Sequence, residues 1–230
     1  MTTLSPRLSA IARLIPQGSR VADVGTDHGY LPIWLMEQGI SPFVIATDLR
    51  PGPLDAAKEN ARQANIQAGI SFRLADGLAA VSPHEVDVVV LAGMGGETIG
   101  GILDRTPWLQ EGVHRLILQP QSKIPRLMDE LAAGGYAVLD QHLAADAGRI
   151  YSVYEVIPGV MEPFVGGARY IHPTLLERGD SLLEAYLAAA SAKLRRALAG
   201  LERGGEKEAE KQAEFKQALS DLERWKRGIA

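Results

Sequence analysis

Short apolar runs rich in β-branched residues alternate with segments of helical spacing along the first 157 residues of the chain. The runs predicted as strands are residues 21–24, 43–47, 70–74, 86–92, 115–118, 136–142 and 150–157. The segments predicted as helices lie near residues 31–38, 53–64, 98–103 and 124–133. Strands that alternate with helices usually pair in parallel, so the pattern predicts an α/β fold in which helices wrap a parallel sheet.

Two features of the strand pattern place particular strands in that sheet. The run at 86–92 is almost continuously apolar, as expected for a middle strand covered on both faces. The last two runs are separated only by a polar turn around residues 144–148. We therefore expect them to pair as an antiparallel hairpin at one edge of the sheet.

The chain changes character after Pro158. Residues 159–173 are punctuated by Gly and Pro, which is typical of a linker. Leucine and alanine then recur at three- and four-residue spacing from residue 174 to 201, and similar spacing resumes at 206–227 after Arg203-Gly204-Gly205. This predicts an antiparallel helical hairpin, or short coiled coil. The expected domains are residues 1–158 and residues 159–230.

Composition narrows the class of protein. The chain has 230 residues, a formal net charge of −4 and no cysteine, so disulfides, thiolate-bound zinc and a cysteine nucleophile are excluded. No apolar run approaches the roughly 18 residues of a membrane span, and the first residues lack the order of a signal peptide. We expect a cytoplasmic protein without a membrane partner. Histidine and aspartate show no metal-ligand spacing, so no metal is expected either.

Charge is distributed unevenly between the two parts of the chain. Residues 158–230 carry 12 Lys/Arg and 11 Asp/Glu, whereas residues 1–157 carry 12 and 17. Charged helix faces are commonly just solvated, but an RNA backbone contact is the alternative. The basic residues around the hairpin tip are Lys193, Arg195, Arg196, Arg203, Lys207 and Lys211, and a second group is Arg224, Lys226 and Arg227.

A glycine turn after the first strand carries the clearest chemical signal. Asp23, Gly25 and Gly29 form D-x-G-x-x-x-G, with Thr26 and Asp27 inside the turn. The dinucleotide fingerprint instead needs G-x-G-x-x-G, in which backbone approaches a pyrophosphate. Carboxylates in the turn would repel a pyrophosphate and suit the sulfonium and ammonium of S-adenosylmethionine. The spacing therefore favours S-adenosylmethionine over NAD as cofactor.

Acidic residues also follow the next two strands. Asp48, with Leu49 beside it, lies 23 residues after Gly25, near where a Rossmann-type sheet places an acid against ribose hydroxyls, roughly 20 residues on. A helix N-cap is the alternative for Asp48. Asp76-Gly77 follows the third strand, where an Asp side chain and a neighbouring backbone amide can hold the amino group of the cofactor's adenine. An Asp-Gly turn without a ligand is equally consistent with the dipeptide.

Two more motifs end the fourth and fifth strands. The run Ala92-Gly93-Met94-Gly95-Gly96 lets backbone approach a bulky group closely, and the carboxyl ends of parallel strands form the ligand crevice. We expect it to border the cofactor's methionine part and the substrate, although a purely structural glycine turn is the alternative. Gln119-Pro120-Gln121 can present amides to a nucleobase edge, or Gln119 can be an ordinary strand-end residue.

Taken in order, these motifs resemble the bacterial tRNA (adenine-22-N1)-methyltransferase family over essentially the whole chain. The resemblance rests on Asp-His-x-Tyr-Leu-Pro at 27–32, Ala-Gly-Met-Gly-Gly at 92–96, Leu-Ile-Leu-Gln-Pro at 116–120 and the terminal helical hairpin. It implies a Rossmann-like class I methyltransferase sheet, S-adenosylmethionine as cofactor and tRNA as partner. It also implies a monomer or weak dimer that makes 1-methyladenosine, with the hairpin helping to grip tRNA.

The family likeness extends to residues outside the glycine turn. Leu4-Ser5-Pro6-Arg7-Leu8 resembles the family's opening helix, which places Arg7 near the pocket. The chain departs from the family at Thr26, Gly29 and Gln121, where Ser, Ala and Asn are common. The expected cofactor-binding residues are Asp23, Gly25, Thr26, Gly29, Asp48, Leu49, Asp76, Gly77, Ala92, Gly93, Met94 and Gly95. The expected substrate-binding residues are Arg7, Gly96, Gln119, Pro120, Gln121, Arg195 and Arg196.

The motifs suggest a mechanism as a hypothesis. Methyl transfer from a sulfonium is an in-line displacement, so the enzyme mainly aligns the nucleophile. An adenine must leave its stack to react, and attack by N1 builds positive charge that a carboxylate can stabilise. The expected catalytic residues are Asp27, with His28 and Tyr30 stacking on or orienting the base. The alternatives are an Asp27 that only caps the following helix and contacts the cofactor's amino group, a packed or hydrogen-bonded His28, and a Tyr30 that only packs.

Two other functions compete with this interpretation. One is a methyltransferase for a small metabolite, in which the hairpin would be an oligomer interface. The other is an RNA-binding protein that keeps a cofactor pocket without catalysis. An NAD-dependent oxidoreductase is disfavoured because the pyrophosphate fingerprint is missing.

Overall fold

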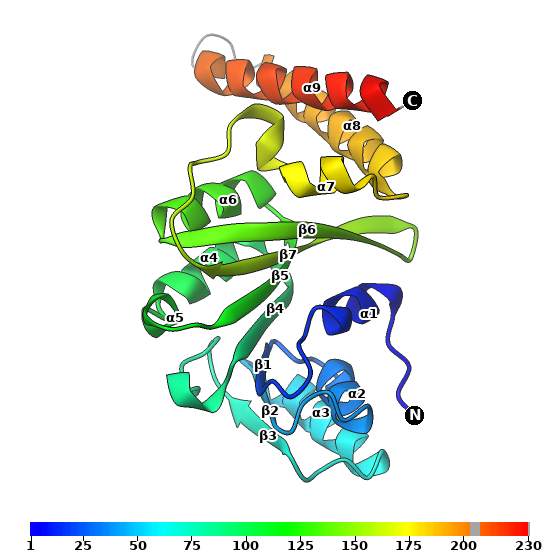
Figure 1. Ribbon diagram of the computed structural model, residues 1–230, viewed down its shortest axis with the longest axis vertical. Helices are drawn as coiled ribbons and strands as arrows, with labels where there is room; N and C mark the ends of the chain where they lie inside the picture. The colour runs from blue at the N-terminus through cyan, green and yellow to red at the C-terminus, as the bar shows by residue number, and fades with distance from the viewer. Residues whose placement is uncertain (203–207, 230) are drawn as a thin grey trace. The chain divides into compact units, whose positions relative to one another are not determined.

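A seven-stranded sheet forms the centre of the first part of the chain (Figure 1). The structure is a computed structural model that describes residues 1–202 and 208–229. The strands follow the order β3-β2-β1-β4-β5-β7-β6. Their bounds are β1 Val21–Val24, β2 Val44–Asp48, β3 Ile70–Leu74, β4 Val88–Gly95, β5 Arg115–Ser122, β6 Tyr136–Asp146 and β7 Arg149–Pro158.

The first five strands are parallel, and β7 is antiparallel to both of its neighbours. All five parallel strands therefore end at one edge of the sheet. The strand order reverses between β1 and β4, because the chain passes from β1 outward to β3 and then returns to the other side of β1. Ligands of open α/β sheets bind at such a reversal, beyond the carboxyl ends of the strands.

Helices cover both faces of this sheet (Figure 1). On one face lie α1 Pro6–Arg13, α2 Tyr30–Glu37 and α3 Pro51–Gln63, and on the other lie α4 Gly96–Asp104, α5 Trp108–Glu111 and α6 Ile124–Ala133. A short 3-10 helix, η1, spans Pro83–Glu85. The expected α/β architecture is confirmed, and α1, which the family resemblance suggested, begins at Pro6 behind a Ser5 cap.

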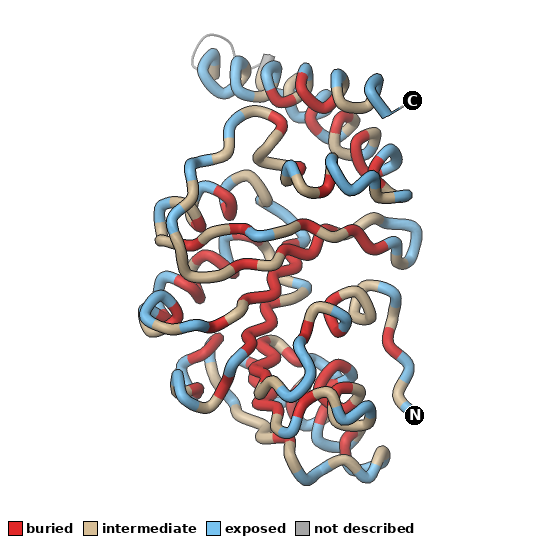
Figure 2. Tube along the Cα trace, viewed as in Figure 1, coloured by how far each residue is buried: buried red, intermediate tan, exposed pale blue. Residues whose placement is uncertain are grey.

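The core lies between the sheet and these helices, and the central strands are the most buried part of the chain (Figure 2). Every residue of β1 and β2 is buried. Ile11 of α1 and Leu35 of α2 pack in one cluster with Val90, Ile117 and Val153 from three strands. Helix α1 thus shares one core cluster with parallel strands β4 and β5 and with the antiparallel strand β7.

The predicted antiparallel hairpin at the sheet edge is confirmed, but its strands are longer than expected. Strand β6 runs to Asp146 and β7 starts at Arg149, so the turn is only Ala147 and Gly148. Both residues have positive φ, 47° and 74°. Two such residues match the right-handed twist of the flanking strands, which lets the ladder continue to the turn.

The chain divides into two compact units, Met1–Met161 and Glu162–Ala230. The second contains the 3-10 helix η2 Gly166–Arg169 and the helices α7 Pro173–Arg178, α8 Leu183–Glu202 and α9 Ala209–Ile229. None of the helices in the described part of the chain combines the length and hydropathy that a membrane crossing requires.

The first helix of the predicted hairpin is interrupted. We expected one helix over 174–201, but α7 ends at Gly179, which has a φ of 67°. The Asp180 carboxylate then accepts a hydrogen bond from the Leu182 amide at 2.8 Å. A left-handed glycine ends a helix and an Asx turn starts a new one, so α8 begins separately at Leu183.

The two long helices of the second unit pack along each other in antiparallel order. Arg195 of α8 forms an ion pair with Glu223 of α9 at 2.6 Å, and the Gln212 side chain donates to the Leu201 carbonyl at 3.2 Å. The predicted helical hairpin is therefore confirmed. The glycine stop at 203–205, Arg203 and Lys207 lie outside the described residues.

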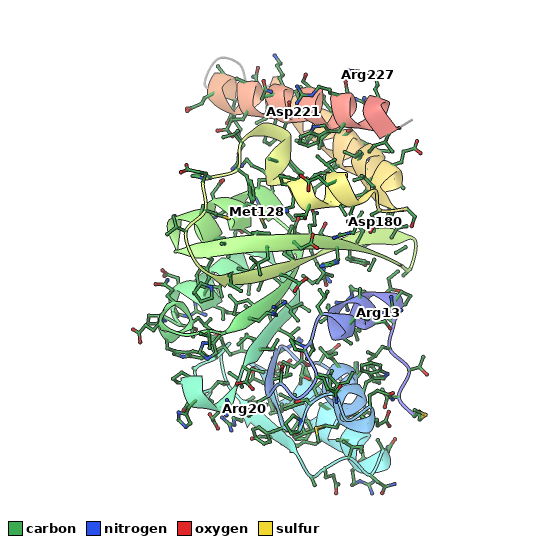
Figure 3. All side chains as sticks on the ribbon, viewed as in Figure 1. Arg13, Arg20, Met128, Asp180, Asp221 and Arg227 are labelled. Atoms are coloured by element: carbon green, nitrogen blue, oxygen red, sulfur yellow. The ribbon has the colours of Figure 1, made fainter. Side chains whose placement is uncertain are left out.

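Asp221 of α9 anchors the short helix η2 within this unit (labelled in Figure 3). Its carboxylate accepts a hydrogen bond from the Gly167 amide at 3.0 Å. A Cβ atom at Gly167 would lie 2.7 Å from the Asp221 Cβ and from the Trp225 ring. Glycine is needed here because no side chain fits between the two segments.

Candidate active site

Carboxylates and glycines gather at the reversal point between β1 and β4. Asp23 is only 6% exposed, and its carboxylate accepts a hydrogen bond from the Thr26 hydroxyl at 2.7 Å. The amides of Gly25 and Thr26 donate to the Thr47 carbonyl at 2.8 and 3.0 Å. These bonds fold the turn back over the end of β2, so the turn and β2 share one surface.

Gly25 and Met94 bring the two sides of the reversal point together. Gly25 has a φ of 73°, and a Cβ atom there would lie 2.5 Å from the Met94 Cε. Gly29 has a φ of 71°, and a Cβ atom there would lie 2.9 Å from the Ala57 Cβ of α3. A larger residue at either position would be strained by the positive φ, and at Gly29 it would also meet the Ala57 backbone, 3.2 Å away. The glycines of the D-x-G-x-x-x-G motif are thus required by the backbone itself.

Burial changes the acidity of Asp23. Loss of solvent raises the pKa of its carboxyl to about 6, and the neighbouring Asp48 adds to that effect. The Thr26 hydroxyl and the Arg7 guanidinium act in the opposite direction, because both favour the ionised form. A buried carboxylate with a raised pKa gains from a positively charged ligand, since the ligand replaces the solvation that burial removed.

Asp48 ends β2 next to Asp23 and is 7% exposed. Its Oδ1 accepts a hydrogen bond from the Arg50 amide at 2.8 Å, which is an Asx turn ahead of α3. The N-cap of α3 is Arg50 itself, without a side-chain cap, so the N-cap alternative for Asp48 is wrong. The following residue, Leu49, is 67% exposed.

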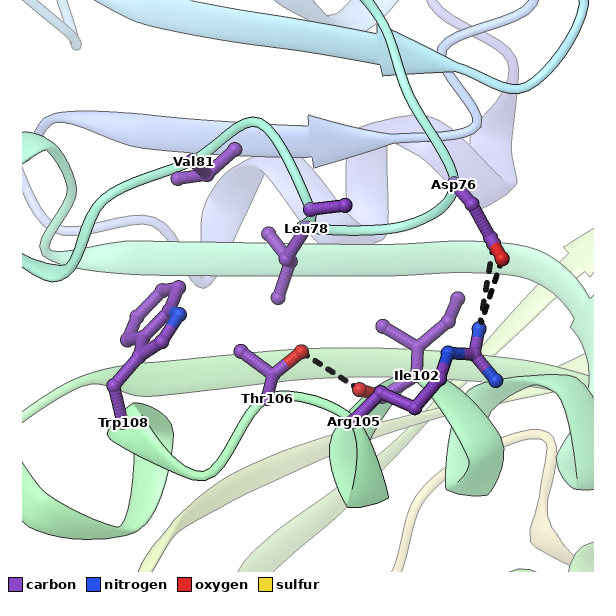
Figure 4. Close-up of a pocket in the computed structure, with 8 residues that line it drawn as sticks. Asp76, Leu78, Val81, Ile102, Arg105, Thr106 and Trp108 are labelled. Carbon is purple, nitrogen blue, oxygen red and sulfur yellow. Dashed lines mark hydrogen bonds and ion pairs between the residues drawn. The ribbon is translucent and has the colours of Figure 1, made fainter.

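Asp76 and Gly77 lie beside a cavity of about 480 Å³ (Figure 4). The Arg105 Nη2 lies 3.3 Å from each Asp76 carboxylate oxygen. Gly77 has a φ of 61°, and its carbonyl accepts from the Thr47 hydroxyl at 3.0 Å. The cavity is lined by Asp76, Leu78, Ala79, Val81, Ile102, Arg105, Thr106 and Trp108. The dipeptide forms a turn, as its composition predicts, and Asp76 also lines a cavity with a mixed polar and apolar wall.

The glycine run forms the end of β4, which extends to Gly95 instead of ending at Ala92 as predicted, and it contains a bulge. The register between β4 and β5 shifts on either side of Met94, and Gly93 has a φ of 79°. The Gly93 amide donates instead to the Gln119 Oε1 at 3.1 Å. Gly96 packs on the end of β5, where a Cβ atom would lie 2.7 Å from the Lys123 carbonyl. Gly93 and Gly96 thus occupy positions that need glycine, the first because of its positive φ and the second because of close backbone packing.

Arg7, Gln119 and Gly93 form a connected hydrogen-bond group. The Gln119 Oε1 accepts from the Arg7 Nη1 at 2.8 Å as well as from Gly93, and the Gln119 Nε2 donates to the Pro120 carbonyl at 3.3 Å. Gln119 is fully buried. Its amide is therefore engaged at both ends inside the protein, whereas Gln121, two residues on, is exposed.

Asp27, His28 and Tyr30 form an exposed group at the start of α2. The Asp27 Oδ2 lies 3.7 Å from the His28 Nε2, with side chains 66% and 51% exposed. The His28 and Tyr30 rings are 5.6 Å apart between centroids, and Tyr30 is 45% exposed. The N-cap of α2 is Gly29, without a side-chain cap. The capping role for Asp27 is therefore wrong, whereas its contact with the cofactor's amino group stays a prediction. His28 and Tyr30 contact each other and keep exposed faces, so packing and stacking both stay open.

Two predicted substrate residues lie in the helical hairpin. Arg195 forms the ion pair with Glu223 described above, and Arg196 is exposed. Sequence reasoning missed Arg105, and it missed Tyr151 of β7, whose ring lies 5.8 Å from the Arg7 guanidinium carbon. Neither residue belongs to a motif, so only the fold could reveal them.

The parallel sheet, the acid-and-glycine turn and the second acid at β2 define a class I methyltransferase. A model of the methyltransferase domain family matches residues 4–154. A Bacillus subtilis tRNA (adenine(22)-N(1))-methyltransferase is 35% identical over 150 residues, which cover 65% of this chain and 63% of that protein. The aligned segment thus spans less than two thirds of this relative.

Solved structures extend the similarity over the whole chain. A Streptococcus pneumoniae protein, described as a candidate tRNA (m1A22) methyltransferase and solved with S-adenosyl-L-methionine, is 29% identical, with a TM-score of 0.83 over 97% of this chain and 99% of that one. The Bacillus subtilis m1A22 tRNA methyltransferase is 25% identical, with a TM-score of 0.79 over 100% and 99%. The chain belongs to the tRNA (adenine-22-N1)-methyltransferase family.

Proposed function

We propose that this protein transfers a methyl group from S-adenosylmethionine to N1 of adenine 22 in tRNA, forming 1-methyladenosine. The observation that carries the proposal is the pair of buried carboxylates, Asp23 and Asp48, beside the left-handed turn at Gly25. Such a site favours a cationic ligand with ribose hydroxyls and disfavours a pyrophosphate. The names and the bound ligand of the relatives described above support the same cofactor and substrate.

The residues at this edge fit S-adenosylmethionine by their chemistry. Asp48 ends the second strand, where an acid can accept hydrogen bonds from a ribose. Asp23 and the turn around Gly25 present negative charge and close-packed backbone to a methionine part. The cavity beside Asp76 and Leu78 suits a flat aromatic base such as adenine. When bound, this cofactor supplies a methyl group on a sulfonium.

The chain's own residues would orient the adenine and stabilise its charge. The N1 lone pair forms a bond to the methyl carbon as the carbon–sulfur bond breaks, which leaves a neutral thioether and a positive charge on the adenine. We assign Asp27 to stabilise that charge and to accept a proton from the exocyclic amine. Tyr30 and His28, both substantially exposed, offer ring surfaces for stacking an extruded base.

Gln119 and Gln121 have different surroundings and therefore different proposed roles. Gln119 uses both ends of its amide to hold Arg7, Gly93 and its own strand end. We therefore assign Gln119 to position Arg7 and the glycine bulge, and Gln121 to meet the substrate. Arg7, next to the bulge, would contact the RNA backbone or the base edge.

We further propose that residues 159–230 form a tRNA-contacting appendage. Arg196 is exposed on α8 and available to a phosphate, whereas Arg195 is engaged with Glu223. Arg196→Glu should weaken tRNA binding. It should also reduce the slope of the logarithm of the binding constant against the logarithm of salt concentration by about 1. Exchanging the partners, Arg195→Glu with Glu223→Arg, keeps the net charge and serves as control. The same proposal places the enzyme in the cytoplasm as a monomer or weak dimer.

Methylation of a defined tRNA transcript tests the proposed function. The full chain is incubated with methyl-labelled S-adenosylmethionine and a transcript carrying A22, or a matched transcript carrying G22, and the nucleosides are analysed by mass spectrometry. We expect labelled 1-methyladenosine only from the A22 transcript. Label confined to small metabolites would favour the metabolite enzyme, and RNA binding without turnover would favour the non-catalytic protein. Either result would overturn the proposal.

A further inference from the structure

A group of metal-ligating side chains lies on the β6–β7 hairpin, apart from the active site. Among the residues that the structure describes, Asp140, His142 and Glu155 each offer one ligand atom within 4.8 Å of the others. The His142 Nε2 lies 2.8 Å from the Glu155 Oε1 and 3.4 Å from the Asp140 Oδ2. The Asp140 side chain is 22% exposed, that of His142 27% and that of Glu155 14%, so small ions in solvent can reach all three.

The pairing of the two strands brings these residues together. Asp140 lies directly opposite Glu155, and His142 lies opposite Val153, so all three point to one face of the sheet. The register shifts between Val138 and Asp140 on β6. Such a bulge redirects the side chains that follow it. Asp140 and His142 would face the opposite side of the sheet if the shift were absent.

Each carboxylate is held at one oxygen and presents the other to His142. The Asp140 Oδ1 accepts a hydrogen bond from the Gln141 amide at 2.7 Å. The Glu155 Oε2 is bound by the Arg115 guanidinium of β5. The remaining oxygens, Oδ2 and Oε1, meet at the same imidazole nitrogen. Ligating carboxylates in metal sites are oriented in this way by hydrogen bonds to their outer oxygen.

The group combines one imidazole nitrogen and two carboxylate oxygens from both strands of the hairpin. Imidazole and carboxylate together are a common ligand set for divalent transition metals. A divalent cation in the same place would contact the nitrogen and both oxygens at once. We propose that Asp140, His142 and Glu155 bind one divalent transition-metal ion of the zinc class, with solvent completing its coordination.

The spacing of the three atoms suits such an ion. Zinc binds imidazole nitrogen and carboxylate oxygen at about 2.0–2.2 Å, so two ligands of one ion lie roughly 3 to 3.5 Å apart. The observed separations of 2.8 and 3.4 Å require little movement. One nitrogen ligand favours zinc, nickel or cobalt over magnesium, which prefers oxygen alone. Spacing along the chain did not predict this site, because Glu155 joins it only through the hairpin register.

The position of the site indicates a structural role. Glu155 lies opposite Ile117 of β5, two residues before Gln119 of the active site. Asp140 and His142 lie further out, on β6, which is the last strand of the sheet. A metal ion would tie β6 to β7 at the edge of the sheet. An ion that binds only the folded chain stabilises it in proportion to the logarithm of its concentration. Methyl transfer should therefore proceed with or without the metal at moderate temperature.

Zinc titration of the full chain tests this proposal. The protein, without an affinity tag and stripped with a chelator, is titrated with zinc chloride by calorimetry, with magnesium chloride as the oxygen-seeking comparison. We expect one zinc ion per chain and a rise in unfolding temperature with zinc but not magnesium. His142→Gln keeps a polar side chain but removes the imidazole, and should weaken zinc binding at least about tenfold. His84→Gln, an exposed histidine elsewhere, is the matched control.

Anomalous scattering from zinc-soaked crystals locates the ion independently of any variant. We expect one peak between the Asp140, His142 and Glu155 side chains. The proposal is overturned if zinc shows no saturable binding, if His142→Gln binds as tightly as the parent, or if the peak lies at another group such as Asp27 and His28. Should His142→Gln fail to fold, Asp140→Asn and the peak in the parent crystals decide the question.

Discussion

Asp27 is the residue whose role in the reaction can be tested most cleanly. It combines a left-handed φ of 52° with a side chain that is 66% exposed. Asn also tolerates this backbone, so Asp27→Asn removes the charge without adding strain. We expect kcat for tRNA methylation to fall by about 10²–10⁴-fold, as for loss of a general base.

Folding of that variant is checked by its unfolding temperature, which should not change because the side chain is exposed. Asp55→Asn is the matched control, since Asp55 is also an exposed carboxylate, at 68%. A kcat for Asp27→Asn within twofold of the parent would remove Asp27 from the chemistry.

Gly25 offers a paired comparison with another glycine of similar backbone. Gly25→Ala adds a methyl group at a φ of 73° and against Met94, whereas Gly18→Ala adds one at a φ of 83° with nothing within 4 Å. Left-handed strain should cost each variant about 1–2 kcal/mol of unfolding free energy. We expect only Gly25→Ala to lose S-adenosylhomocysteine affinity, by at least about tenfold, as measured by calorimetry. Equal losses in both variants would contradict the role assigned to this turn.

The buried carboxyl of Asp23 makes stability depend on pH. Its pKa is about 6 in the folded chain against 3.8 in the reference state. Between these values the folded protein holds a proton that the unfolded chain releases, so the free energy of unfolding falls as pH rises from about 4 to 6.

Asp23→Asn should therefore unfold with about 1–3 kcal/mol more free energy than the parent at pH 7.5, and with little difference at pH 4. Urea unfolding at the two pH values measures the change. The same variant should bind S-adenosylhomocysteine more weakly at pH 7.5. A stability difference that is the same at both pH values would show that Asp23 does not titrate as described.

Some of these residues could be predicted from the sequence and others could not. Asp23, Gly25 and Asp48 belong to a local spacing that fixes their place at strand ends, so their neighbourhood followed from the motif. The ion pair of Asp76 with Arg105 and the link from Arg7 to Gln119 join residues 29 and 112 positions apart. Nothing in a one-dimensional pattern specifies such partners.

Among the secondary-structure elements, strands were predicted more reliably than helix breaks. A buried strand such as β4 is recognisable because β-branched residues follow one another, from Val88 to Val90. Helix α5 and the break at Gly179 were not predicted, because a four-residue helix has no periodicity and leucines continue across the break. Strand ends depend on turn conformation, which explains the underestimated length of β6 and β7.

One substitution in the turn between β6 and β7 should stabilise the folded protein. Ala147 adopts a φ of 47° ahead of Gly148 at 74°, and Asn-Gly is the preferred pair for such a turn. Ala147→Asn should raise the unfolding temperature by about 1–3 °C, which corresponds to roughly 0.5–1 kcal/mol. Ala145→Asn, on the exposed side of β6 in extended backbone, is the control and should not stabilise. A lower unfolding temperature for Ala147→Asn would contradict the turn geometry.

Considered as a whole, the molecule separates the tasks of its two units. The first unit supplies one edge where five parallel strands end, and every predicted cofactor residue lies in it. The second unit supplies a helical hairpin with exposed basic residues, and its proposed partner is the tRNA. This division explains why the family likeness extends over the full chain while the matched methyltransferase domain spans residues 4–154.

Binding of the demethylated product tests the central claim that this strand edge is an S-adenosylmethionine site. Calorimetry of the full chain with S-adenosylhomocysteine should give saturable binding at one site per chain, and Asp48→Asn should weaken it at least about tenfold. If folded protein gave no heat with S-adenosylhomocysteine or with S-adenosylmethionine at millimolar concentration, that result would contradict the account.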